Sequence, residues 1–214
     1  HGEFNGELYY TATVSNVFYV DRALFWITAG GFVQQLSNFP DENFDTWGSG
    51  PIGDIYELNS KLYMLCQDNT LGLELFVYQN GSFTPLDLLP GLNSSNPSLL
   101  TIFNNKLYFT ASDFIQNKFY MLDPASDYIT EITSPANFNL PQKLKVYNGQ
   151  LYLSYFDLSG VGYLYAMDSF NTMNLIFLNG FSTLNYGSEL EVSNNVLYLT
   201  CLNQANGSDI EPFS

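Results

Sequence analysis

The chain has 214 residues, a length that suits one all-β domain with a core of its own. Aromatic residues make up 17% of it, mainly Tyr and Phe, which favour strands over helices. Its 21 acidic residues outnumber its 6 basic ones and give a net charge of −15. A surface of this sign repels phosphate backbones, so nucleic acid and anionic membranes are excluded as expected partners. No run of apolar residues is long enough to cross a bilayer, so no membrane span is predicted.

The composition, rich in Asn and poor in Lys, is typical of extracellular and cell-surface proteins. Three Asn-x-Ser sequons, each in a predicted turn, begin at Asn80, Asn93 and Asn206. They indicate a glycoprotein, although such tripeptides also arise by chance in chains rich in Asn and Ser. His1 is the only histidine, and we expect it to be a processed end or a tag remnant, because a copper-binding N-terminal histidine needs a second one.

The pattern Asn-x-x-Leu-Tyr recurs five times and divides a single repeat domain into five similar units. Its tyrosines are Tyr9, Tyr63, Tyr108, Tyr152 and Tyr198, which are 54, 45, 44 and 46 residues apart. The units span approximately 1–50, 51–98, 99–141, 142–187 and 188–214. We expect each Leu-Tyr pair to pack in the core or between units, because a residue type present in every unit serves the packing of the repeat first.

A complete unit carries four short apolar runs in chain order. One run precedes the motif, the motif begins a second, and two more follow, separated by Asn-Gly, Gly-Ser and Ser-Pro turns. The third runs contain Leu24-Phe25, Leu75-Phe76, Phe119-Tyr120 and Leu164-Tyr165. The fourth runs are residues 33–36, 86–89, 129–132 and 175–178. No window has helical periodicity, so each unit is predicted to be a four-stranded antiparallel meander.

A four-stranded meander cannot bury both of its faces alone, so neighbouring units must stack. Radial stacking of units of this length describes a β-propeller. We therefore predict an all-β, five-bladed β-propeller-like array of four-stranded antiparallel repeats, with an open β-solenoid or twisted array as the alternative. The last unit is predicted to be incomplete. Either the sequence is a fragment or has a degenerate final blade, or a strand of another chain completes it at the open sheet edge.

One stretch of the chain resembles a known repeat. It runs from Leu73-Glu74-Leu75-Phe76 through the linker Pro90-Gly91-Leu92-Asn93-Ser94-Ser95-Asn96-Pro97 to Leu107-Tyr108-Phe109-Thr110-Ala111-Ser112-Asp113. This stretch is similar to the bacterial ELWxxDGT, or hyalin-like, repeat, and the whole chain follows the same pattern. The resemblance implies propeller blades in a secreted or adhesin-like protein and lends no catalytic residues. The Asp-Gly-Thr end of that motif is replaced here by Tyr78-Gln79-Asn80-Gly81-Ser82.

Aspartates at one offset in the repeat are the first candidate site. Asp68, Asp113 and Asp157 each lie five residues after a motif tyrosine, where the other units have Val14 and Asn203. One interpretation is that these side chains cap hairpins by bonding their own backbone. The other is a ring of oxygens that binds calcium or sugar hydroxyls. Calcium is thus the only cofactor that the sequence suggests.

An insertion of about nine residues between the first two units is the second candidate site. Asp41, Asn43 and Asp45 have the alternating spacing that opens a calcium-binding loop. The match is partial, because the required glycine and the bidentate glutamate are both missing. Trp47 in the same loop is a candidate for stacking on a sugar ring; otherwise it packs onto the body of the domain.

Cys66 and Cys201 occupy equivalent places in units that are not adjacent in chain order, which puts them beyond disulfide reach. They are predicted to be free, buried thiols that fill small apolar spaces. The chain has no Cys/His spacing of the kind that binds zinc.

These features favour a non-enzymatic extracellular or cell-surface module for adhesion, glycan binding or assembly into a surface layer or filament. Its expected partners are a glycan, a surface protein, or further copies of itself joined through an open sheet edge. No catalytic residues are assigned, because the chain has no histidine suited to a triad, no phosphate-binding glycine loop and no zinc motif. The alternative is a propeller glycoside hydrolase with paired carboxylates, for which Asp68, Asp113 and Asp157 are the candidates.

Overall fold

The described part of the computed structural model is built of strands and turns. It comprises residues 2–4, 7–15, 20–28, 30–38, 50–134, 138–157, 161–176, 190–202 and 210–213. Within these ranges the strands form five antiparallel sheets, of which four have four strands and the last has three. This arrangement confirms the predicted all-β, propeller-like array of four-stranded repeats with an incomplete last blade. No helix in these ranges is long and apolar enough to cross a bilayer.

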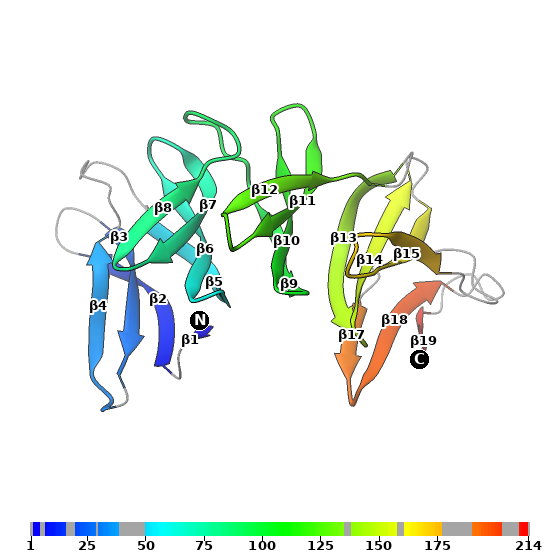
Figure 1. Cartoon of the computed structure of the whole chain (residues 1–214), viewed down its shortest axis with the longest axis horizontal. Coiled ribbons are helices and arrows are strands. Elements are labelled where there is room, and N and C mark those ends of the chain that lie inside the picture. The colour runs from blue at the N-terminus through cyan, green and yellow to red at the C-terminus, as the bar shows by residue number, and fades with distance from the viewer. Residues whose placement is uncertain are drawn as a thin grey trace. The chain divides into compact units, whose positions relative to one another are not determined.

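Strands that follow one another in the chain are neighbours in every sheet, so each sheet is a meander (Figure 1). The first sheet contains β1 (Gly2–Phe4), β2 (Glu7–Ser15), β3 (Val20–Ile27) and β4 (Val33–Asn38). The second contains β5 (Gly50–Leu58), β6 (Lys61–Asp68), β7 (Gly72–Gln79) and β8 (Ser82–Leu86). The third contains β9 (Ser98–Phe103), β10 (Lys106–Ser112), β11 (Asn117–Asp123) and β12 (Tyr128–Ile132). The fourth contains β13 (Phe138–Tyr147), β14 (Gln150–Asp157), β15 (Gly162–Met167) and β16 (Met173–Ile176). The last contains β17 (Leu190–Ser193), β18 (Val196–Leu202) and β19 (Ile210–Phe213).

The chain divides into two compact units, and each is described separately below. The first unit contains His1–Pro97, Ala111–Asn117 and Asp123–Tyr128. The second unit contains Ser98–Thr110, Lys118–Leu122 and Ile129–Ser214. The first two sheets therefore belong to the first unit and the last two to the second. The third sheet has its body in the second unit, whereas the β10–β11 loop and the β11–β12 turn belong to the first.

The asparagine of the repeated motif forms a two-residue hairpin turn between the first and second strands of a sheet. The central pairs of these turns are Asn59-Ser60, Asn104-Asn105, Asn148-Gly149 and Asn194-Asn195, with φ values between 47° and 71°. Positive φ at both central positions defines a type I′ turn, whose twist matches that of the flanking strands. Asparagine and glycine tolerate this left-handed backbone better than other residues, which explains why asparagine recurs in the motif.

The fourth strand of the second sheet lies earlier than the sequence predicted. A strand was expected at residues 86–89, whereas β8 spans Ser82–Leu86. The Asn80-Gly81 turn, with φ values of 53° and 83°, reverses the chain within two residues, so the strand begins directly after it. Asp87 then accepts a hydrogen bond from the backbone N–H of Leu89 at 3.0 Å and turns the chain into the linker.

The Leu-Tyr pair of the motif joins neighbouring sheets. Adjacent residues of a strand point to opposite faces, so the leucine and the tyrosine pack against different neighbours. In the first unit, Tyr9 of the first sheet forms one buried cluster with Leu62 and Met64 of the second. In the second unit, Tyr108 of the third sheet packs in a cluster with Leu151 of the fourth. Burying one such leucine contributes about 1.5–3 kcal/mol, so the stacked faces hold each array together.

Candidate binding site

Asp68 and Asp113, two members of the predicted ring, cap the turns that follow them. Oδ1 of Asp68 accepts hydrogen bonds from the N–H of Thr70 at 2.6 Å, its hydroxyl at 2.6 Å and the N–H of Leu71 at 2.9 Å. Oδ1 of Asp113 accepts bonds from the N–H groups of Ile115 at 3.1 Å and Gln116 at 2.8 Å. Both carboxylates thus satisfy backbone donors of their own turns, as the capping interpretation requires.

The structure leaves the metal sites as predictions. Among the residues it describes, no three or more His, Cys, Asp and Glu side chains are placed to hold a metal ion. The backbone of Asp157 ends β14, and its side chain lies outside the described part of the chain. Also outside are the inserted-loop residues Asp41, Asn43, Asp45 and Trp47, together with His1 and Asn206.

Cys66 is a free, fully buried thiol in the cluster between the first two sheets. Burial raises the pKa of the Cys66 thiol well above its usual value, so it remains protonated and acts as a small apolar filler. The side chain of Cys201 lies outside the described residues. Asn80 and Asn93 are exposed, where a glycan has room, and their modification stays a prediction.

Glu74, which belongs to the resembled repeat motif, is completely buried in β7 and fastens the linker between β8 and β9. Its carboxylate accepts hydrogen bonds from the N–H of Ser95 at 2.6 Å, the hydroxyl of Ser95 at 2.5 Å and the N–H of Leu88 at 3.4 Å. Burial raises the pKa of Glu74, and the bonds from Ser95 oppose that rise. Ser94 adds a further bond, because its hydroxyl accepts from the N–H of Leu73 at 2.8 Å.

The linker also passes close to the backbone of the second sheet and the end of β10. A Cβ atom on Gly72 would lie 2.5 Å from Oγ and 2.9 Å from N of Ser94, and its φ is +77°, so only glycine fits here. The N–H of Ser112, the last residue of β10, donates to the carbonyl of Ser95 at 2.6 Å. The linker and the β10–β11 loop are therefore tied together within the first unit.

The motif tyrosines fasten a sheet to a turn of the following sheet. The Tyr63 hydroxyl donates to Oδ1 of Asp127 at 2.6 Å, and Nζ of Lys61 lies 2.5 Å from Oδ2 of the same carboxylate. In the second unit, the Tyr108 hydroxyl donates to Oδ1 of Asn171 at 2.7 Å. Burial raises the pKa of Tyr108 to about 12. Both acceptors lie in the turn between a third and a fourth strand, so the same contact recurs one sheet further along.

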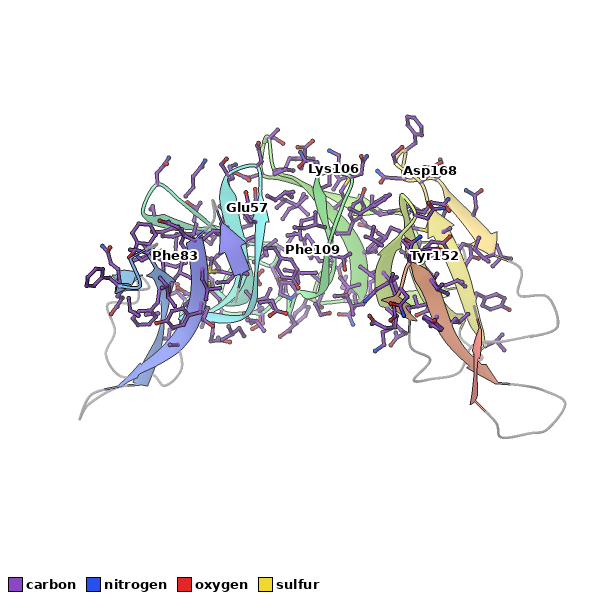
Figure 2. The ribbon with its side chains drawn as sticks, turned by 90° about the horizontal axis from the view of Figure 1, so that it is seen from below. Glu57, Phe83, Lys106, Phe109, Tyr152 and Asp168 are labelled. Atoms are coloured by element: carbon purple, nitrogen blue, oxygen red, sulfur yellow. The ribbon has the colours of Figure 1, made fainter. Side chains whose placement is uncertain are left out.

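Figure 2 labels two residues that lie near the contact in the second unit. Lys106, at the start of the strand that carries Tyr108, and Asp168, at the start of the accepting turn, lie at the same end of the unit. Oδ1 of Asp168 accepts bonds from the N–H groups of Phe170 and Thr172, both at 2.9 Å. This cap shapes the turn that presents the acceptor to the tyrosine, so these polar residues stabilise the repeat.

The β8–β9 linker and the β10–β11 loop of the first unit both lie at the upper end of Figure 1. Large apolar side chains on these two loops are exposed. The exposed fractions are 74% for Phe114, 88% for Ile115 and 75% for Leu92. Phe114 has a φ of +77°, an outlier for a bulky residue, and such strain costs about 1–3 kcal/mol. The Ser112 hydroxyl accepts a bond from the Phe114 N–H at 3.2 Å, next to the Asp113 cap. We call Leu92, Phe114 and Ile115 the loop patch.

Sequence reasoning missed the loop patch. Phe114-Ile115 follows its capping aspartate at the place where the second of the five repeats has Asn69-Thr70. Capped turns normally carry Gly, Asn, Asp or Ser, so an apolar pair in one is a signal that comparison of the repeats offers. Leu92 had no comparable signal, because the course of the linker depends on its bonds to the buried Glu74.

Comparisons with known proteins agree with the fold. No protein-family model and no curated protein matches the chain. A structure from a study of two prolyl endopeptidases and their inter-domain dynamics is similar, with a TM-score of 0.58, 11% identity and coverage of 98% of this chain and 34% of that one. YjhT (TM-score 0.46, 12% identity, coverage 92% and 73%) and TolB from Acinetobacter baumannii (0.44, 11%, 85% and 46%) are less similar.

The likeness to the prolyl endopeptidase is one of fold alone, because so few residues are identical. This chain spans about a third of the length of that protein. The sheets, their strand order and this likeness define the chain as a β-propeller-like protein.

Proposed function

We propose that the protein is a non-enzymatic extracellular or cell-surface module that binds a glycan or a surface protein through the loop patch. Binding residues often lie on loops that a rigid scaffold positions. Here the scaffold consists of stacked sheets, and a buried carboxylate and backbone bonds fasten both loops to it. The resemblance to bacterial surface repeats supports the location, and the Asn-rich composition agrees with it.

The backbone of Phe114 is the observation that carries this proposal. A side chain that is 74% exposed contributes little to folding, yet its residue is held at a φ of +77°. Strain of this kind persists only where the surroundings enforce it, and it is typical of binding sites. A loop backbone that is held in place in advance loses less entropy on binding, and aromatic residues contribute heavily to interfaces.

The chemistry of the loop patch defines the class of partner. Exposed aromatic and aliphatic side chains on these two loops suit the apolar face of a sugar or an apolar side chain of a surface protein. The net charge of −15 disfavours polyanionic partners. A neutral or cationic glycan or protein surface is therefore the expected partner.

The alternative function, a glycoside hydrolase with paired carboxylates, depends on Asp68, Asp113 and Asp157. In the two that the structure describes, Oδ1 already accepts bonds from the following turn, so the turn sets the orientation of each carboxylate. A hydrolase instead needs two carboxylates that face one glycosidic bond. The binding function is better supported by the geometry of the described residues.

A glycan array and a panel of immobilised extracellular proteins test the proposal with the whole chain. The Phe114→Ala variant should bind the selected probe at least tenfold more weakly, about 1.4 kcal/mol. Phe170→Ala is the matched control, because Phe170 is 86% exposed in a turn of the second unit and should bind within twofold of the wild type. Trp47→Ala tests the inserted loop in parallel.

Two results would contradict the proposal. One is equal binding by wild type and Phe114→Ala on every probe that the protein recognises, and the other is no binding on either panel. Release of reducing sugar from array glycans, abolished by Asp68→Asn or Asp113→Asn, would favour the hydrolase instead.

A further inference from the structure

The linker between β8 and β9 contains a sequon whose two ends have opposite environments. Asn93, the acceptor residue, is exposed, whereas Ser95, which supplies the required hydroxyl, is completely buried. A glycan on the side-chain nitrogen of Asn93 therefore has room in the folded protein. The enzyme that attaches the glycan must also recognise the hydroxyl two residues later, because serine or threonine at that place defines the sequon.

Hydrogen bonds hold each backbone and side-chain polar atom of Ser95. Its hydroxyl donates to Oε2 of Glu74 at 2.5 Å, and its N–H donates to Oε1 of the same carboxylate at 2.6 Å. Its carbonyl accepts a bond from the N–H of Ser112 at 2.6 Å. Glu74 is itself completely buried, so the carboxylate and the hydroxyl are both out of reach of an enzyme in the folded chain.

The residues on either side of Ser95 are fixed as well. The Ser94 hydroxyl accepts a bond from the N–H of Leu73 at 2.8 Å, and the N–H of Asn96 donates to the carbonyl of Leu73 at 3.2 Å. Ser94 also lies against Gly72, where the backbone leaves no space for a Cβ atom. Exposure of the Ser95 hydroxyl therefore requires the linker to leave β7, because the movement of one side chain is not enough.

A second sequon in the same sheet has the opposite character. Asn80, Gly81 and Ser82 are all exposed at the turn between β7 and β8. Its acceptor residue and its hydroxyl-bearing residue are thus both at the surface, and folding does not bury the group that a glycosyltransferase recognises. The two sequons differ in whether folding hides the hydroxyl, so Asn80 provides an internal reference for Asn93.

We propose that Asn93 is a glycosylation site that is open only before the chain folds, and that the contact between Glu74 and Ser95 closes it. The donor is a sugar activated by a diphosphate group. In the transfer, the amide nitrogen of Asn93 forms a bond to the anomeric carbon of the sugar and loses one proton. The bond from that carbon to the diphosphate breaks, and the diphosphate leaves with the electron pair. Once Ser95 is buried, the exposed asparagine is no longer a substrate.

Glycosylation of Asn93 affects the loop patch. Asn93 directly follows Leu92 in the chain, so a glycan attached to it emerges next to an exposed member of the patch. A glycan is bulky and strongly hydrated, so it obstructs the apolar surface near it. A chain that is glycosylated before it folds should therefore bind its partner more weakly than a chain that folds first. This consequence rests on the function proposed for the loop patch, whereas the order of folding and glycosylation does not.

The timing of modification tests the proposal on the full chain. A soluble N-glycosyltransferase that uses UDP-glucose is either co-expressed with the protein or added to the purified folded protein with its donor. Mass spectrometry of the peptide that carries Asn93 measures the occupancy of the site. We expect modification of Asn93 during co-expression. On folded protein, the initial rate should be at least about tenfold lower for the wild type than for Glu74→Leu, in which Ser95 has lost its acceptor.

Two controls separate a local opening of the linker from a general loss of stability. Leu151→Ala removes a buried side chain in the second unit and destabilises the chain away from the linker, so its rate at Asn93 should stay within about twofold of the wild type. Occupancy of Asn80 should be the same in all variants. Far-UV circular dichroism establishes that each variant is folded, and Glu74→Gln, which keeps an acceptor, should resemble the wild type at Asn93.

Equal rates at Asn93 in the folded wild type and in Glu74→Leu would overturn the proposal. An Asn93 that stays unmodified when the transferase is co-expressed would overturn it as well. Binding of the modified and unmodified chains to the probe selected on the glycan array or protein panel tests the consequence for the loop patch, and equal binding refutes that consequence alone. If the unmodified chain binds no probe, the function proposed for the loop patch fails, while the occupancies of Asn93 still decide the order of folding and glycosylation.

Discussion

Exchanging Phe114 for glycine and for alanine measures the strain at the loop patch. Phe114 has a φ of +77°, a conformation that costs an L-residue about 1–2 kcal/mol and is unstrained for glycine. Glycine in turn loses more conformational freedom on folding than alanine, by about 0.5–1 kcal/mol. The glycine variant should therefore be the more stable of the two by about 0.75 kcal/mol, and by at most about 1.5 kcal/mol. The lost ring cancels in this comparison, since both variants lack it.

Phe170 provides the control for this comparison. It is also a highly exposed phenylalanine in a turn, but its backbone lies outside the left-handed region. At position 170 the glycine variant should be the less stable of the two, by up to about 1 kcal/mol.

Urea unfolding and thermal unfolding both resolve these differences. For a chain of this size, 1 kcal/mol corresponds to about 2–4 °C in the thermal midpoint. An alanine variant at position 114 that equals or exceeds the glycine variant would refute the strain argument. The same order of stabilities at both positions would refute it as well.

Three further predictions concern the polar bonds that hold the linker and the β15–β16 turn in place. Glu74→Leu leaves the buried N–H of Ser95 without its acceptor and should lower the free energy of unfolding in urea by about 1–3 kcal/mol. Glu74→Gln keeps an acceptor and should lower that free energy less. Burial raises the pKa of Glu74, so the folded state binds the carboxyl proton more tightly than the unfolded state does. The free energy of unfolding should therefore fall as the pH rises from the ordinary glutamate pKa through the raised one. Thermal midpoints measured over a pH series should show a smaller decrease for Glu74→Gln. Tyr108→Phe should cost about 0.5–1.5 kcal/mol through its lost bond to Asn171, while Tyr152→Phe, whose contact is 3.4 Å long, should change stability little.

The repeat made much of the fold predictable. Asn-x-x-Leu-Tyr combines a residue suited to a type I′ turn with two apolar residues on opposite faces of a strand, so it marks both a hairpin and the stacking of sheets. The misplaced fourth strand of the second sheet shows where such reasoning fails. The apolar residues 86–89 read as a strand, but Leu88 and Leu89 lie in the linker, where the carboxylates of Glu74 and Asp87 accept bonds from their N–H groups.

The candidate site was only partly accessible from the sequence. Capping of the following turn by Asp68 and Asp113 was one of the two interpretations of these aspartates. Each cap joins residues at most three apart in the chain, so local chemistry is enough to predict it. The loop patch was missed, because exposure and a positive φ at Phe114 are properties of the folded loop.

The five repeats, their antiparallel strands and the tight turns follow from local sequence patterns, because strand alternation and turn chemistry act over a few residues and repeat along the chain. The folded chain alone reveals that Glu74 holds the linker through Ser95 and that Tyr63 bonds Asp127. Glu74 meets Ser95 only when the linker folds back over its own sheet, and Tyr63 meets Asp127 only when two sheets stack. Their contacts depend on burial and distance, which no local pattern encodes.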